Sequence, residues 1–304
     1  MKIRVGTATE QNKQPEPPER KPNEDRVISA ISASEVIVAV MDGIPVLRDQ
    51  SGAYPQRENG ALAAQIAAEE IVEFLERQGL PNADALRWAF NWANEQIKDR
   101  NERLNTYKKE PPQWLATVGA ALWANEESER NFFGYIDDPL AFLMAPDGTI
   151  ELITEDQHIP SEGHFWEAHK EEMRAQDPAG NATFRAHQDV HVRNRISAKC
   201  WCGELFRGWG ALTGEEAAMS FVSVQTILTP PGTRIVITTD AFEAIGAGNA
   251  KERRAEDYRD ALVATRKMNP QAAAQEMIRL IRMSEQRKRC KSDDAGLAVV
   301  DFEN

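Results

Sequence analysis

The stretch Glu35-Val-Ile-Val-Ala-Val-Met-Asp-Gly43 indicates most directly what kind of fold this chain forms. Residues 36–41 are apolar and include three valines and an isoleucine, which is typical of a buried strand. An acidic residue, Asp42, and a glycine, Gly43, end the run. The sequence therefore predicts a buried strand with a carboxylate at its end.

Further strands and two pairs of helices are predicted on both sides of this run. Alternation before it predicts strands at 2–9 and 26–32, separated by a polar loop at 11–22. After it, helical spacing predicts helices at 60–78 and from the N-cap Asn82 to about 104, where Trp88 and Trp92 are expected to pack. The next predicted strands form an antiparallel meander at 117–123, 131–136, 141–144 and 149–153. The last predicted elements are strands at 221–228 and 234–238, helices at 256–267 and 271–287, and a strand at 296–302.

The charge balance argues against a nucleic-acid partner. The 304 residues contain 36 Lys and Arg against 48 Asp and Glu, a formal net charge of −12. Such a chain repels the phosphate backbone unless it carries a strong local basic patch. The basic runs are short, as in Arg287, Lys288, Arg289 and Lys291, so we expect no nucleic acid among the partners.

The chain also carries no expected membrane or secretion signal. Residues 1–10 lack the charged-then-apolar pattern of a secretory signal, and the longest apolar stretch, 115–124, is too short to span a bilayer. Three cysteines, with Cys200 and Cys202 one residue apart, do not make a disulfide framework for a chain of this size. We therefore expect a cytoplasmic protein with reduced thiols and no membrane partner.

Acidic residues lie at the edges of four predicted strands. They are Glu24 with Asp25, Asp42, Asp240, and Asp293 with Asp294. A sheet can bring such edges together, and several carboxylates at one rim repel each other unless cations neutralise them. Oxygen ligands of this kind suit Mg²⁺ or Mn²⁺. The alternative is that these acids lie beside strands because they tolerate turn geometry.

Ordered motifs along the chain resemble those of the metal-dependent type-2C (PPM) serine/threonine phosphatases. The motifs are RKPNED at 20–25, VMDG at 40–43, TTDAF at 238–242 and SDDA at 292–295. Between them, LATVG at 115–119, DDPLA at 137–141 and TED at 154–156 lie where the family has its Gly-Ser-Thr, Gly-Asp-Ser-Arg-Ala and Thr-x-Asp motifs. Each motif is short, and their shared order makes the resemblance specific.

The resemblance implies an α+β fold in which two packed antiparallel β-sheets are flanked by helices, a four-layer αββα sandwich. It covers the chain from about Val5 to Phe302 and so implies a single domain over 1–304. The segment at about 157–195 is similar to the family's variable flap beside the active site.

The resemblance also assigns site residues. Asp42 would bridge two Mg²⁺ or Mn²⁺ ions, with Asp240 and Asp293 completing one of them. The Gly43 carbonyl and Glu24 would complete the other, while Asp25 supports that rim. Arg20 would grip the substrate phosphate with its planar fork of donors, and Asp138 would serve a possible third ion.

The implied activity is hydrolysis of phosphoserine and phosphothreonine in proteins by a metal-activated water, which requires no protein nucleophile. The implied partner is a phosphoprotein, such as a serine/threonine kinase or its target. Several motif positions depart from the family: Ile44 and Pro45 replace the His and Gly of many members, and Asp137, Leu140 and Ala241 also differ. The changes at Asp137, Leu140 and Ala241 concern the rate and the third ion. The altered loop at Ile44 and Pro45 favours the alternative, a catalytically inactive phosphatase-like protein that binds phosphoproteins as a regulator.

One other metal site is conceivable from the sequence. His187, His191, Cys200 and Cys202 carry side chains that bind zinc, although a one-residue cysteine spacing is unusual for such a site. Three glycines, Gly208, Gly210 and Gly214, form no phosphate-loop signature and are predicted to serve turns.

Overall fold

Two five-stranded antiparallel sheets form the centre of the molecule. The computed structural model describes residues 1–11, 23–44, 59–106, 114–157, 192–199, 205–246, 254–288 and 294–304. The first sheet has the strand order β10-β5-β4-β3-β2 and the second the order β1-β12-β11-β6-β7. All neighbouring strands in these two sheets run antiparallel.

The elements lie close to the predicted ranges. The first sheet contains β2 (Arg26–Ile31), β3 (Glu35–Gly43), β4 (Thr117–Asn125), β5 (Arg130–Ile136) and β10 (Ser223–Leu228). The second contains β1 (Lys2–Glu10), β6 (Leu140–Met144), β7 (Ile150–Leu152), β11 (Arg234–Thr238) and β12 (Ala295–Glu303). A small hairpin joins β8 (Ala198–Lys199) to β9 (Leu205–Phe206), and two 3₁₀ helices are η2 (Glu216–Ser220) and η3 (Asp240–Ile245).

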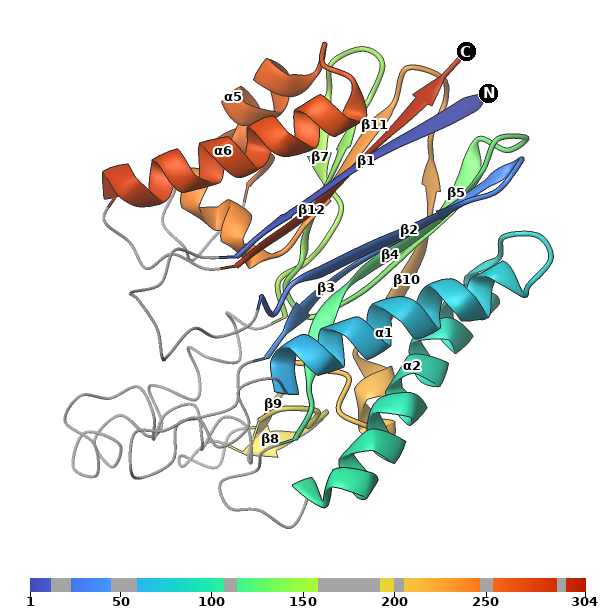
Figure 1. Cartoon of the computed structure of the whole chain (residues 1–304), viewed down its shortest axis with the longest axis vertical. Helices are drawn as coiled ribbons and strands as arrows, with labels where there is room; N and C mark the ends of the chain where they lie inside the picture. Colours follow the sequence, from blue (N-terminus) through green and yellow to red (C-terminus); the bar gives the residue numbers. More distant parts are fainter. Residues whose placement is uncertain are drawn as a thin grey trace.

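Helices cover the outer face of each sheet, as Figure 1 shows. The pair α1 (Asn59–Glu76) and α2 (Ala83–Leu104) covers the first sheet, and the pair α5 (Ala255–Thr265) and α6 (Pro270–Lys288) covers the second. One apolar core lies under each helix pair, and a third lies between the two sheets. The predicted α+β class and αββα layering are therefore confirmed.

The predicted four-stranded meander is wrong. Strands β4 and β5 pair in the first sheet, whereas β6 and β7 pair in the second. The chain changes sheets between β5 and β6, where Asp137 has a left-handed backbone with φ of 70°. This crossing lets Phe133 and Tyr135 of β5 face Ala141 of β6 within the core between the sheets, so both hairpins bury apolar surface against each other.

Helix α2 begins as predicted but exposes its two tryptophans. The Asn82 side chain accepts a hydrogen bond from the Ala85 amide at 2.8 Å, which is the expected N-cap. Trp88 and Trp92 are 59% and 41% exposed and lie outside the core, but Trp92 packs against Phe74 of α1, with the ring centroids 6.4 Å apart. They lie on the side of α2 opposite the buried residues Leu86, Phe90, Ala93 and Ile97.

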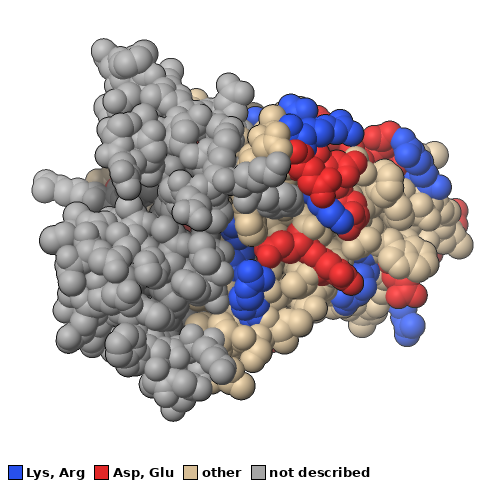
Figure 2. All heavy atoms as spheres, turned by 90° about the horizontal axis from the view of Figure 1, so that it is seen from below, with Lys and Arg blue, Asp and Glu red and all other residues tan. Residues whose placement is uncertain are grey.

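Charged side chains of both signs lie on the described surface. Figure 2 shows acidic and basic side chains interspersed over the described part of one face, with no continuous basic patch there. Within the described ranges, no helix is long and apolar enough to cross a membrane. Most of the flap-like segment predicted at 157–195 lies outside the described residues.

Candidate active site

The core between the sheets ends in polar residues at one rim of the sandwich. On β3, alternate residues Val36, Val38 and Val40 belong to this core, and Asp42 is the next residue in the same phase. On β5 the same series runs from Phe133 and Tyr135 to Asp137. The period of two along each strand therefore places an acid where the apolar core stops.

Residues of the second sheet reach the same rim. Ile235 and Ile237 of β11 belong to the core, and Thr239 follows in phase. On β12 the core series Ala298 and Val300 leads back through Gly296 to Asp294. Residues that are far apart in the sequence thus lie at one rim because both sheets end here.

A buried hydrogen bond joins the two sheets at this rim. The backbone amide of Glu24 donates to Asp294 Oδ2 at 2.7 Å, and both residues are about 5% exposed. The Gly43 amide donates to the Glu24 carbonyl at 3.1 Å. The segment before β2 is therefore held by the end of β3 on one side and by the start of β12 on the other.

A second contact between the sheets fixes the start of η3. The Thr239 hydroxyl donates to Asp25 Oδ2 at 2.7 Å and accepts from the Gly296 amide at 3.2 Å. The Thr239 amide in turn donates to the Gly296 carbonyl at 3.0 Å. Because Asp240 follows Thr239 directly, these bonds determine where Asp240 enters the rim, with its side chain half-buried.

Oxygen atoms of Glu24 and Gly43 converge beside the first turn of α1. A Cβ atom added to Gly60 would lie 2.7 Å from Glu24 Oε1, 3.0 Å from the Gly43 carbonyl oxygen and 3.0 Å from the Ile44 carbonyl oxygen. The Glu24 carboxylate thus lies at the N-terminus of α1. A glycine at position 60 leaves these oxygens the space that a larger residue would fill.

The structure places each predicted site residue that it describes at this rim. Glu24, Asp25 and Gly43 lie in direct contact with one another or with the second sheet, and Asp42 and Asp240 lie half-buried beside them. Asp138 is half-buried in the turn between β5 and β6. The end of β5 pairs with Gly119, and the start of β6 pairs with Thr238. Arg20 and Asp293 lie outside the described residues, as do His187, His191, Cys200 and Cys202 of the alternative zinc site.

The donor chemistry of the rim fits Mg²⁺ or Mn²⁺. Within the described ranges no group of three or more His, Cys, Asp or Glu side chains lies close enough together to hold a metal ion. The predicted ligand set also includes the Gly43 carbonyl, which is a backbone group, and Asp293, which lies outside the described residues. The convergence of the Glu24 carboxylate with the Gly43 carbonyl at Gly60 supplies two hard oxygen donors in one small space, as these ions require.

Three residues of the rim were not among the predicted site residues. Thr117 donates its hydroxyl to the Asp42 carbonyl oxygen at 2.6 Å, Thr239 joins Asp25 to β12, and Gly60 leaves room for the oxygens of Glu24 and Gly43. Thr117 and Thr239 each lie within a quoted motif, so their position beside the acids was a usable signal. Gly60 carries no such signal, because its role depends on where α1 packs.

Of the three glycines predicted to serve turns, only Gly214 has the positive φ that favours glycine, whereas Gly208 and Gly210 allow close packing. A Cβ on Gly208 would lie 1.9 Å from the Val192 carbonyl oxygen, and one on Gly210 would lie 2.2 Å from the Phe221 Cβ. Gly214 has a left-handed backbone with φ of 89°.

Several solved structures with a similar fold are serine/threonine phosphatases by name. The catalytic domain of the phosphatase PstP in complex with two manganese ions is 16% identical, with a TM-score of 0.60 and coverage of 99% of each chain. The S. agalactiae serine/threonine phosphatase is 14% identical, with a TM-score of 0.61 and coverage of 99% of this chain and 100% of the other. RsbX in complex with magnesium is 11% identical, with a TM-score of 0.51 and coverage of 98% and 94%.

Family membership follows from the sequence match rather than from these distant structures. No curated protein matches the chain closely enough to count as a relative. A family model described as protein phosphatase 2C matches residues 18–282, which is most of the chain and includes all but the last of the quoted motifs. The chain belongs to the protein phosphatase 2C family.

Proposed function

We propose that this protein is a Mg²⁺- or Mn²⁺-dependent phosphatase that removes phosphate from phosphoserine and phosphothreonine in proteins. The observation that carries the proposal is the rim with acidic residues on both sheets, where the Glu24 amide donates to Asp294 of the other sheet. Manganese in PstP and magnesium in RsbX support a divalent ion in this chain as well.

The proposed ligands are distributed over both sheets. Asp42 would bridge two ions, Asp240 and Asp293 would complete one, and Glu24 with the Gly43 carbonyl would complete the other. Asp25 supports this set through its bond with Thr239, and Asp138 would serve a third ion. When bound, the ions would supply an acidified water and positive charge toward the phosphoryl oxygens.

Phosphate binding and the position of the chain after Gly43 are proposed to depend on the protein's own groups. Arg20 is the proposed phosphate grip, since a guanidinium matches phosphate oxygens with two parallel donors. Ile44 holds the chain after Gly43 by donating its amide to the Ala116 carbonyl at 3.0 Å, and it packs against the cluster around Trp209. Neither Ile44 nor Pro45 carries a side-chain proton donor, and water is the proposed source of the leaving group's proton.

We propose further that residues 1–304 form one domain and that the substrate is a cytoplasmic phosphoprotein, a serine/threonine kinase or a target of one. The family acts on phosphoproteins, which supports this class of substrate. A regulator that keeps the fold without turnover is the alternative that the activity assay decides.

Replacement of Asp240 by asparagine tests the proposal. The wild type is expected to hydrolyse a phosphothreonine peptide in Mn²⁺ and to stop when a chelator is added. Asp240→Asn removes one anionic ligand and is expected to lower kcat/KM at least about 100-fold, equivalent to about 3 kcal/mol of transition-state stabilisation. Peptide hydrolysis, followed as released phosphate, is the measurement.

The matched control is Asp99→Asn, which makes the same change at an exposed position on α2 and should leave kcat/KM unchanged. A folded wild type that stays silent over a range of Mn²⁺ and Mg²⁺ concentrations would contradict the enzyme and favour the non-catalytic binding protein. Equal losses of kcat/KM in Asp240→Asn and Asp99→Asn would contradict the proposed role of Asp240 as a metal ligand.

A further inference from the structure

The backbone of Asp42 is held by a hydroxyl group that none of the proposed chemistry uses. Thr117 Oγ1 donates to the Asp42 carbonyl oxygen at 2.6 Å, and Thr117 is completely buried. Thr117 begins β4 and pairs with Gly43 in the register of the first sheet. Its hydroxyl therefore acts on the peptide unit that joins Asp42 to Gly43, the two residues proposed to share the metal centre.

Thr117 is itself held from the opposite side. Its amide donates to the Leu212 carbonyl at 3.1 Å, and the Leu212 amide donates back to the Thr117 carbonyl at 2.9 Å. This isolated bridge makes residues 211–215, here called the clamp loop, the neighbour of β4 at this point. Any displacement of the clamp loop is thus transmitted to Thr117 through two hydrogen bonds.

Two buried asparagines of α2 hold the clamp loop. Asn94 Oδ1 accepts from the amides of Thr213 and Gly214 at 3.1 and 2.8 Å, and its Nδ2 donates to the Glu215 carbonyl at 3.0 Å. Asn101, two turns further along α2, donates to the carbonyls of Thr213 and Leu115 at 2.9 and 3.1 Å. The loop is therefore bound to a long helix that packs on the first sheet.

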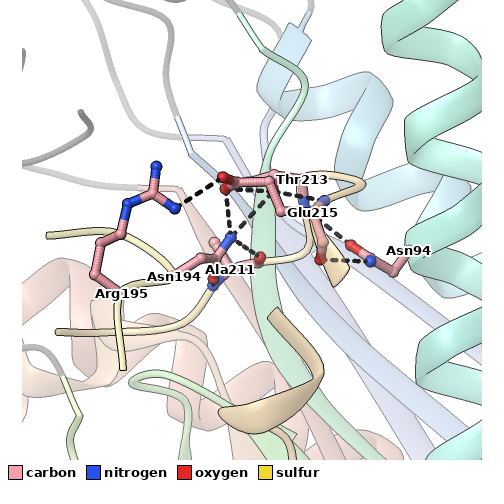
Figure 3. Close-up of polar contacts among 6 residues, drawn as sticks. All are labelled: Asn94, Asn194, Arg195, Ala211, Thr213 and Glu215. Atoms are coloured by element: carbon pink, nitrogen blue, oxygen red, sulfur yellow. Dashed lines mark hydrogen bonds and ion pairs between the residues drawn. The ribbon is translucent and has the colours of Figure 1, made fainter. Parts of the chain in front are cut away.

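A third asparagine, Asn194, precedes the clamp loop in the chain and binds it through its side chain, as Figure 3 shows. Its side chain exchanges hydrogen bonds with the Ala211 backbone at 2.9 and 3.0 Å and also donates to Thr213 Oγ1 and Glu215 Oε2. Asn194 is 1% exposed and has a left-handed φ of 55°. Arg195 adds an ion pair with Glu215 at 3.2 Å.

We propose that Thr117 is a positioning residue for Asp42, and that the clamp loop and its three asparagines set the affinity of the metal centre by holding Thr117. The proposal rests on the proposed function for the presence of that centre. The physical reason is that partners one step removed from a metal orient its ligands, and their loss commonly weakens binding about 10- to 100-fold. Metal affinity can therefore depend on residues 194 and 211–215, which lie outside the predicted ligand set.

Replacement of Thr117 by valine tests the role of the hydroxyl. Thr117→Val keeps the β-branched shape and the backbone bridge but removes the donor. We expect the Kd for Mn²⁺, measured by calorimetric titration of the protein with Mn²⁺ alone, to rise about 10-fold. Thr117→Ser restores the donor and is expected to bring the Kd back to within about twofold of wild type.

Two further variants separate positioning from stability. Thr265→Val is the matched control, because Thr265 is also fully buried and donates its hydroxyl to backbone carbonyls, in α5. It should lower the melting temperature as Thr117→Val does without changing Mn²⁺ affinity. Asn194→Gly tolerates the positive φ, removes the side-chain bonds to the clamp loop, and is expected to weaken Mn²⁺ binding about threefold.

Unchanged Mn²⁺ affinity in folded Thr117→Val would overturn the proposal. If that variant does not fold, unchanged affinity in Asn194→Gly would overturn it instead. A wild type that binds Mn²⁺ but hydrolyses no phosphopeptide contradicts only the proposed function. A wild type that binds no Mn²⁺ contradicts both.

Discussion

Gly43→Ala is expected to lower the free energy of unfolding by about 3 kcal/mol and to remove phosphatase activity. An added Cβ would lie 2.2 Å from the Gly60 carbonyl oxygen and 2.3 Å from the Gly60 carbonyl carbon. Both are backbone atoms in the first turn of α1, so no side chain can rotate to relieve the overlap. The end of β3 and the start of α1 must separate.

The separation affects the site as well as the fold. The Glu24 carboxylate and the Gly43 carbonyl converge only because Gly60 lies against Gly43. Moving α1 away therefore disperses two of the proposed ligands. Urea unfolding and Mn²⁺-dependent hydrolysis of a phosphothreonine peptide, measured on the same preparation, test the two effects.

Gly79→Ala is the matched control for this prediction. Gly79 follows α1 and has no neighbouring atom within 4 Å of an added Cβ, so its replacement should leave both stability and activity nearly unchanged. A Gly43→Ala protein as stable and active as the Gly79→Ala protein would show that β3 and α1 do not pack as closely as the structure has them.

Arg234→Met is expected to lower the free energy of unfolding by about 4 kcal/mol. Arg234 is 4% exposed and forms two parallel bonds to Asp301, from Nε to Oδ1 at 2.6 Å and from Nη2 to Oδ2 at 2.7 Å. It also donates to the carbonyls of Thr265 and Met268, both at 2.6 Å. Methionine leaves the Asp301 carboxylate largely buried without its cation, and it leaves two carbonyls without this donor.

The comparison for Arg234→Met is the exposed ion pair between Glu73 of α1 and Arg77, which directly follows that helix. The Arg77 side chain is 66% exposed, and the same replacement there should cost less than about 1 kcal/mol. The double variant Arg234→Met with Asp301→Leu is expected to recover part of the loss, because no buried charge remains. Equal destabilisation at positions 234 and 77 in urea unfolding would contradict the buried role of Arg234.

Local elements were predictable from the sequence because they depend on short-range patterns. The apolar run at 36–41 is β3, the range 234–238 is β11, and Asn82 is the N-cap of α2. Strand partners were not predictable in the same way. The meander prediction was wrong because no local pattern between β5 and β6 indicates that the chain passes from one sheet to the other there.

The exposed tryptophans illustrate a second limit of sequence patterns. Spacing of four residues places Trp88 and Trp92 on one side of α2, but it does not determine which side meets the sheet. The opposite side carries Leu86 and Phe90, which fill the space above the first sheet. Packing against a partner surface decides the outcome, and that surface is built from distant residues.

The sequence by itself determined the residue types at the rim and their order along the chain. Carboxylates at strand ends, in motifs of the protein phosphatase 2C family, follow from the amino acids alone. Only the tertiary structure decided that the Glu24 amide meets Asp294, that Gly60 faces Gly43 and that Thr117 holds Asp42. The physical reason is that these contacts join residues from 17 to 270 positions apart, and such contacts form only when the sheets and helices pack together.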